Sequence, residues 1–270
     1  MNNIFRRINV EQHPKQLYKE DFTEYLLCLA LDVGEGMLRN GGEIGRVEDT
    51  IERICRAYGA LHVEVFTIIS VINAAIRMPD GSYSSQLRRV KSTSTNLSVL
   101  EDLNALSRKI CAHTPALEDF DEMISEIKRR RAYPRAVIIS ASAITVGAFT
   151  IFFGGGVTEA FIAMLIGAIM SLIDGLPTKR LNFMAKTVFS SFTAAILALL
   201  SVKFGIGNNP DAIIIGALML LVPGLAFGTA LRDLLCGDLL AGTLKTLQAF
   251  LAALMIAFGY VLAATLAGGV

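Results

Sequence analysis

Residues 136–173 read AVIISASAITVGAFTIFFGGGVTEAFIAMLIGAIMSLI, an apolar run in which Glu159 is the only charged residue. The run is long enough for two helices that each cross a bilayer, because one span needs about 20 residues. The glycines at 154–156 supply the turn between them. The same pattern continues along the chain and predicts five spans, near 135–153, 157–176, 185–203, 211–231 and 246–267. This half of the chain is therefore predicted to be an α-helical transmembrane bundle of about five spans.

The composition divides the chain into two parts. Hydrophobic residues make up 53% of the sequence and charged residues 18%, and the mean hydropathy of +0.53 excludes an ordinary soluble protein. Residues 1–131 nevertheless hold 18 of the 25 Lys and Arg residues and 19 of the 24 Asp and Glu residues. We therefore predict a water-soluble domain over residues 1–131 and the transmembrane domain over residues 132–270.

The first domain has the periodicity of an α+β fold. Apolar residues recur at helical spacing in two stretches, Phe22, Leu26, Leu29, Val33 and Met37, then Val47, Ile51, Ile54 and Tyr58. A turn over residues 40–43 separates these two helices, and Val, Ile, Phe and Thr over 62–77 and 82–90 indicate a three-stranded sheet. Helices then return, with Ser98 and Thr114 as the expected N-cap residues.

Basic residues near the span ends predict the orientation of the bundle. They cluster before the first span, between the second and third, and before the fifth, as Lys128, Arg129, Arg130, Arg131 and Arg135, then Lys179, Arg180 and Lys186, then Arg232 and Lys245. With five spans, all these clusters fall on one side of the bilayer. The first domain is therefore predicted to be cytoplasmic and Val270 to lie outside.

Several functional classes lack a sequence signal. Neither half carries the strong basic excess that nucleic-acid binding requires. The four cysteines and three histidines show no metal-site or redox spacing, and no catalytic motif is present. We therefore expect no enzyme activity, no metal, no cofactor and no nucleic-acid partner.

Ionisable and helix-breaking residues in the second half are the first candidates for a site. Pro223 and Gly224 interrupt the fourth predicted span, as helix breaks do in transporters. Asp174 lies in the last turn of its span, where the helix dipole disfavours an anion. Asp238 and Lys245 are expected on one helical face. The predicted substrate or proton pathway combines these features in Asp174, Pro223, Gly224, Arg232, Asp233 and Asp238.

A second candidate lies in the first domain. Asp49 and Glu52 each have an arginine four residues later, so those pairs are expected to be a solvated helix face. Glu43, Arg46 and Glu48 have no such partners and follow a glycine-rich turn. The alternative interpretation is therefore a membrane-anchored cytoplasmic enzyme or sensor with its site at these three residues.

Small residues at four-residue spacing mark the faces on which the spans pack. They are Gly167, Ser171 and Gly175, then Gly224 and Gly228, then Ala249, Ala253 and Ala257. These faces are expected to pack within the bundle, and a dimer face in a homo-oligomer is the alternative interpretation.

Two separated elements resemble a known family. Residues 40–48, NGGEIGRVE, resemble the NGAExxRVE element of the ThrE-type threonine/serine exporters. Residues 222–224, VPG, and 231–238, LRDLLCGD, resemble their VPG and RDLLAGD elements, with Gly42, Gly45 and Cys236 as departures. The likeness covers residues 22–268, and it makes Asn40, Gly41, Glu43, Arg46 and Glu48 the motif of the first domain.

The resemblance implies a function. The chain corresponds to the first unit of the long family members, and it is similar to the split form, in which a YjjP-like subunit works with a YjjB-like small membrane subunit in succinate export. The expected protein is thus a subunit of an exporter of small carboxylate metabolites in the bacterial inner membrane. Its substrates would be threonine and serine or dicarboxylates, and proton motive force would drive it.

Overall fold

The computed structural model describes residues 21–91, 94–129, 133–175 and 183–268. By their contacts they form two compact units, the first made of residues up to Arg130 together with Leu225–Thr246, and the second of Arg131–Gly224 with Leu247–Val270. The predicted domain boundary at 131 and the loop with Lys179 and Arg180 lie outside the described residues. The N-terminal unit thus includes a segment that the sequence assigns to the membrane half.

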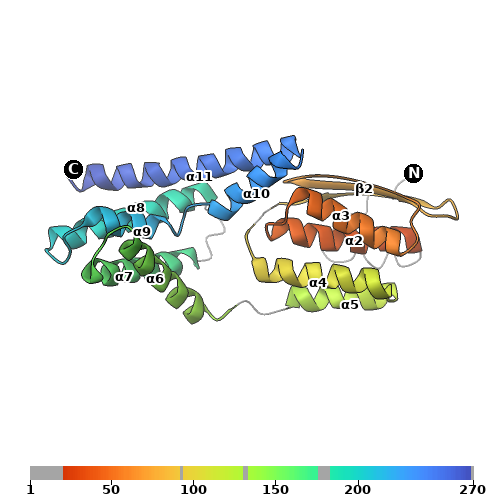
Figure 1. Ribbon diagram of the computed structural model, residues 1–270, viewed down its shortest axis with the longest axis horizontal. Coiled ribbons are helices and arrows are strands. Elements are labelled where there is room, and N and C mark those ends of the chain that lie inside the picture. The colour runs from red at the N-terminus through yellow and green to blue at the C-terminus, as the bar shows by residue number, and fades with distance from the viewer. Residues whose placement is uncertain (1–20, 92–93, 130–132, 176–182, 269–270) are drawn as a thin grey trace, which may run out of the picture. The chain divides into compact units, whose positions relative to one another are not determined.

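The first unit is layered (Figure 1). A three-stranded antiparallel sheet of order β1-β2-β3 packs on one helix pair, which in turn packs on a second pair. The elements are α2 (Phe22–Arg39), α3 (Ile44–Ala57), β1 (His62–Ile68), β2 (Val71–Arg77), β3 (Tyr83–Arg89), α4 (Leu97–His113) and α5 (Leu117–Arg129). The predicted pair of helices and the three strands of the first domain are confirmed.

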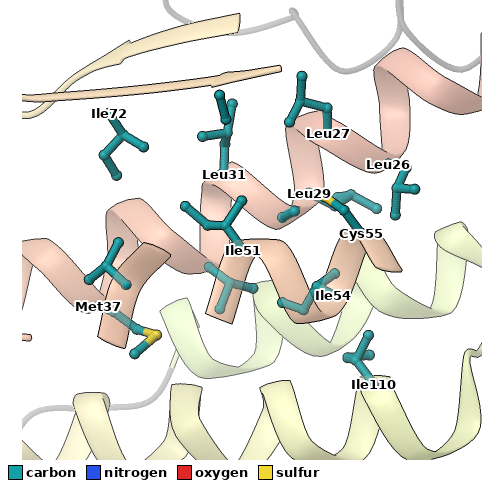
Figure 2. Packing of buried hydrophobic residues seen from close by; sticks show 14 of the residues in the cluster. Leu26, Leu27, Leu29, Leu31, Met37, Ile51, Ile54, Cys55, Ile72 and Ile110 are labelled. Atoms are coloured by element: carbon teal, nitrogen blue, oxygen red, sulfur yellow. The ribbon is translucent and has the colours of Figure 1, made fainter. Parts of the chain in front are cut away.

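Helix α2 is the centre of this unit because most of its residues are buried. It contacts the sheet on one side and α4 and α5 on another, and its buried Asp32 is paired with Arg88 and Lys128. Figure 2 shows Leu31 on the sheet side near Ile72, and Ile110 of α4 facing Ile54 of α3. All four side chains are fully buried. Burial on both sides of the α2–α3 layer fixes the turn that joins these helices.

Two predicted helix caps are wrong. Helix α4 is capped by Asn96, whose side chain accepts a hydrogen bond from the Val99 amide, and not by Ser98. Thr114 ends α4 in a left-handed conformation, with φ of 38°, instead of starting the next helix. The Asn96 side chain thus satisfies the start of α4, and the backbone amide of Thr114 donates to the Ile110 carbonyl at its end.

The second unit is an all-helical bundle. It contains α6 (Arg135–Phe152), α7 (Val157–Asp174), α8 (Phe183–Lys203), α9 (Pro210–Leu218) and the later part of α11 (Leu239–Leu266). Among the described residues, α6, α7, α8 and α11 are the four helices long and apolar enough to cross a membrane. Glycines allow close packing, since a Cβ on Gly167 of α7 would lie 2.9 Å from the Val146 side chain of α6. For Gly167, the predicted packing within the bundle is confirmed.

The fourth predicted span, 211–231, is not one helix. Helix α9 ends at Leu218, the stretch 219–223 is not helical, and α10 (Gly224–Leu235) follows. Proline lacks an amide hydrogen and restricts the residue before it, so the helix stops ahead of Pro223. The expectation of about five spans is therefore corrected to four described helices of spanning length, while the break predicted at Pro223 and Gly224 in the other segment is present.

Helix α9 is held at its start by two polar contacts. The Asn209 side chain accepts a hydrogen bond from the Ala212 amide, 3.1 Å away. Glu159, buried in the first turn of α7, accepts a hydrogen bond of 2.9 Å from the Asn208 amide. Helices α6, α7 and α8 all contact α9. This short helix is thus fixed inside the bundle although it covers only part of a bilayer.

Candidate functional site

The turn between α2 and α3 is built by its small and polar residues. The side-chain amide of Asn40 donates a hydrogen bond of 2.7 Å to the Gly36 carbonyl. Gly41 has φ of +92°, a conformation that glycine adopts without strain. The Gly42 amide donates to the Met37 carbonyl at 2.9 Å, and a Cβ on Gly42 would meet that oxygen at 2.9 Å. The turn therefore needs glycine at both positions and places Glu43 at the start of α3.

Arg232 of α10 reaches this turn. Its Nη1 lies 2.8 Å from Oε1 of Glu43, which joins the two segments of sequence singled out as motifs. The arginine side chain is 63% exposed and the glutamate side chain 21%. An ion pair this open to solvent contributes little stability. The pair is therefore accessible, and the guanidinium keeps further donors available.

Asp233, the next residue, is buried and fully engaged. It is 2% exposed, and its Oδ2 lies 2.6 Å from Nζ of Lys245, which also donates to the Gly42 carbonyl at 3.4 Å. Its Oδ1 accepts a hydrogen bond of 3.3 Å from the Ile44 amide. Glu43 forms no side-chain cap for α3. Asp233 thus supplies the negative charge that favours a helix N-terminus from a distant part of the chain.

A tight turn connects α10 to α11 and positions Asp238. Gly237 has φ of +98°, and the Asp238 amide donates to the Asp233 carbonyl at 2.9 Å. Oδ2 of Asp238 lies 3.5 Å from the position of a Cβ on Gly45. Lys245, which was expected on one helical face with Asp238, pairs with Asp233. Asp238 instead faces the first turn of α3.

Glu48 lies one turn further along α3. Its Oε1 accepts a hydrogen bond of 2.7 Å from the Thr67 amide in β1. Burial raises the pKa of the Glu48 carboxyl above its ordinary 4.5, the Thr67 hydrogen bond opposes the shift, and the charge of Asp238 adds to it. Glu48 therefore links helix to sheet and also lies within the electrostatic reach of Asp238.

The raised pKa gives a pH-dependent prediction for Glu48→Gln. The folded protein holds the Glu48 proton more tightly than the unfolded chain, so the wild type loses stability relative to the variant as pH rises above about 4.5. The difference should level off above the folded-state pKa. Urea unfolding across this range, with the exposed Glu101→Gln as control, measures it. A difference that does not change with pH for Glu48→Gln would contradict the assignment.

The remaining predicted residues lie apart from these contacts. Arg46 is exposed, and its side chain forms no hydrogen bond or ion pair with another described residue. Asp174 belongs to the second unit, where its Oδ1 lies 2.6 Å from Nζ of Lys186. Pro223 and Gly224 mark the break before α10. The site in the first unit is thus built on Glu43, Glu48, Arg232, Asp233 and Asp238 together with Lys245.

Sequence reasoning did not assign Lys245 to the site. The two motifs are separated by 189 positions between Glu43 and Arg232, and no spacing rule connects them. The available signal was a lysine near the start of an apolar helix, where a charge needs a partner. In chemical terms the arrangement can hold a carboxylate through Arg232. Among the described residues no group of three or more His, Cys, Asp and Glu could hold a metal ion.

Comparisons with known proteins show what the whole chain is similar to. The family model described as putative threonine/serine exporter matches residues 28–267. A probable threonine/serine exporter of Mycobacterium tuberculosis is 24% identical over 81% of this chain, which spans only 42% of that relative. The probable succinate transporter subunit YjjP of Klebsiella aerogenes is 26% identical over 86% of this chain and 90% of the relative. No solved structure matches the chain.

Proposed function

Because the chain belongs to the threonine/serine exporter family, we propose that it is a subunit of a secondary exporter of small carboxylate metabolites. The substrates are threonine and serine, or dicarboxylates such as succinate, and proton motive force drives their export. The subunit works with a second, YjjB-like small membrane subunit in the bacterial inner membrane, with its N-terminal unit in the cytoplasm. The threonine/serine exporter and the succinate transporter subunit to which the chain is similar support these substrate classes.

The observation that carries the proposal is the broken segment between α8 and α10. Helix α9 has nine residues and is about 14 Å long, which is about half of a hydrocarbon core of about 30 Å. The backbone then leaves the helix at residues 219–223, where the Leu221 amide donates a hydrogen bond to the Leu218 carbonyl in a turn that comes before Pro223. Non-helical backbone at membrane depth is tolerated where it lines a cavity, and transporters use such carbonyls to contact substrate. A protein whose helices only anchor it to the membrane would need no such break.

The exposed ion pair suggests how a carboxylate is recognised. Arg232 binds the carboxylate of Glu43, which is chemically the same group that every proposed substrate carries. A substrate carboxylate can take the place of Glu43, because the pair is open and an arginine can bind a carboxylate in bidentate fashion. Asp238 and Glu48 are the acidic groups beside it, and the raised pKa of Glu48 suits a group that takes up and releases a proton.

Vesicle efflux tests the proposal. Proteoliposomes loaded with labelled threonine or labelled succinate would contain this subunit alone or with its partner, with and without a proton gradient. We expect efflux only when both subunits and the gradient are present. Full efflux from this subunit alone would contradict the need for a partner, and no efflux of either substrate in any combination would overturn the proposed function.

The broken crossing also predicts where the carboxyl end lies. We expect α9 with residues 219–223 to form one crossing, in addition to the crossings of α6, α7, α8 and α11. With these five crossings and a cytoplasmic N-terminal unit, Val270 lies outside. Reporter fusions at residue 21 and after Val270 should report opposite sides of the membrane. A cytoplasmic signal at both ends would show that α9 enters and leaves on one side.

A further inference from the structure

Helix α10 has two faces of opposite character. Ala230 and Asp233 are buried, and Asp233 contacts the start of α3. Phe227, Leu231 and Leu235 recur every four residues on another side, and they are 51%, 48% and 81% exposed. We call these three residues the apolar stripe of α10. An amphipathic helix with such a stripe is typical of a helix that lies in a membrane interface.

The length of α11 indicates what this stripe meets. The helix has 28 residues and is about 42 Å long, which exceeds a hydrocarbon core of about 30 Å by roughly eight residues. Its first residues, up to Thr246, pack in the first unit, and Ala241 is part of the core there. By this length we expect the start of α11 to extend beyond the hydrocarbon core, and the short turn at Gly237 joins α10 to that end of the helix.

Exposed leucines follow the apolar stripe along the chain, at the start of α11. Leu239, Leu240 and Leu244 at the start of α11 are 65%, 58% and 39% exposed, and Leu247 follows at 52% where the second unit begins. The apolar exposure of the stripe thus continues along the sequence into α11. Exposing these apolar side chains to water would be unfavourable, and the surfaces of soluble proteins seldom carry large apolar patches.

We propose that α10 is an interfacial helix whose apolar stripe lies in the lipid of the bilayer surface. Its other side holds Asp233 on the N-terminus of α3, so the Glu43–Arg232 pair lies at the level of the lipid head groups. The inference rests on the amphipathic pattern and on the length of α11, and not on what the protein transports. It replaces the second half of the predicted fourth span by a helix that lies on the membrane.

Tryptophan fluorescence tests this directly, because the chain contains no tryptophan. The full chain would be reconstituted as Leu235→Trp in vesicles whose acyl chains are brominated either near the head group or near the chain end. Leu235 is the most exposed residue of the stripe, so the substitution disturbs no packing. Phe258→Trp, an exposed position in the middle of α11, is the control for the span, and Tyr83→Trp in β3 is the control for water.

The expected result is a larger loss of Leu235→Trp emission with bromine near the head group than with bromine near the chain end. Phe258→Trp should show the reverse order, and Tyr83→Trp should respond only to aqueous acrylamide. Quenching of Leu235→Trp by acrylamide and not by brominated lipid would overturn the proposal. Blue-shifted emission that neither quencher reaches would also overturn it, because the stripe would then be covered by protein. Leu231→Trp repeats the test at a second position of the stripe.

Discussion

Replacing Lys245 with methionine is expected to open the junction between α10 and the start of α3. Asp233 is 2% exposed, and the side chain of Lys245 is 14% exposed, so the variant leaves a buried carboxylate without its counter-ion. Removing one partner of a buried ion pair costs about 3–5 kcal/mol. The cost should appear as local opening, because Asp233 is also the acceptor for the Ile44 amide.

Hydrogen exchange measures this opening at residues 40–48 and 225–246. We expect exchange there to speed up by roughly a hundredfold or more in Lys245→Met, which corresponds to the cost given above. The double variant Asp233→Asn with Lys245→Met should recover most of the protection, since no unpaired charge remains. Arg53→Met removes an exposed pair with Asp49 in the same unit and should change little. Unchanged exchange in Lys245→Met would show that the pair does not hold the junction.

Replacing Arg232 with alanine is expected to abolish most export while the protein still reaches the membrane. Hydrogen bonds to charged groups contribute about 1.5–3 kcal/mol, so efflux should fall at least about tenfold and up to about a hundredfold. Arg232→Lys should retain part of the activity, because lysine supplies a charge but cannot bind a carboxylate in bidentate fashion. The exposed Glu43–Arg232 pair contributes little to folding, so abundance should stay close to that of the wild type.

Efflux would be measured beside membrane abundance in the presence of the second subunit. Arg53→Ala is a matched control, since Arg53 is also an exposed arginine paired with a carboxylate in the first unit. It should export normally. Normal efflux from Arg232→Ala would remove Arg232 from the substrate path. Loss of both abundance and efflux in Arg232→Ala and Arg232→Lys would instead give the residue a structural role.

Much of the fold follows from local sequence patterns. The helices over Phe22–Arg39 and Ile44–Ala57 were predicted because their apolar residues repeat at helical spacing, and the three strands because β-branched residues cluster between turns. The apolar runs predicted α6, α7, α8 and α11 because each is long enough to cross a bilayer. Pro223 and Gly224 also predicted a break in the fourth span, but the sequence did not show that α9 already ends at Leu218.

The candidate site was predicted only in pieces. Both motifs were found, but Glu43 and Arg232 were assigned to different candidate sites, and Lys245 was placed on one helical face with Asp238 without a partner. Asp174 was grouped with Arg232, whereas the two belong to different units. Spacing rules describe neighbours on one helix, and the Glu43–Arg232 and Asp233–Lys245 pairs depend on contacts between helices and across a turn.

The sequence by itself determined that the protein has a charged α+β part and a membrane-spanning helical part. A domain surrounded by water needs polar residues that alternate with apolar ones, whereas helices surrounded by lipid need long apolar runs. The tertiary structure decided that residues 225–246 pack with the first part, and that Asp233 lies on the N-terminus of α3. The physical reason is the cost of an unpaired buried charge. Asp233 must find a cation and an amide donor wherever the fold supplies them, and these partners are set by three-dimensional proximity, which no local pattern records.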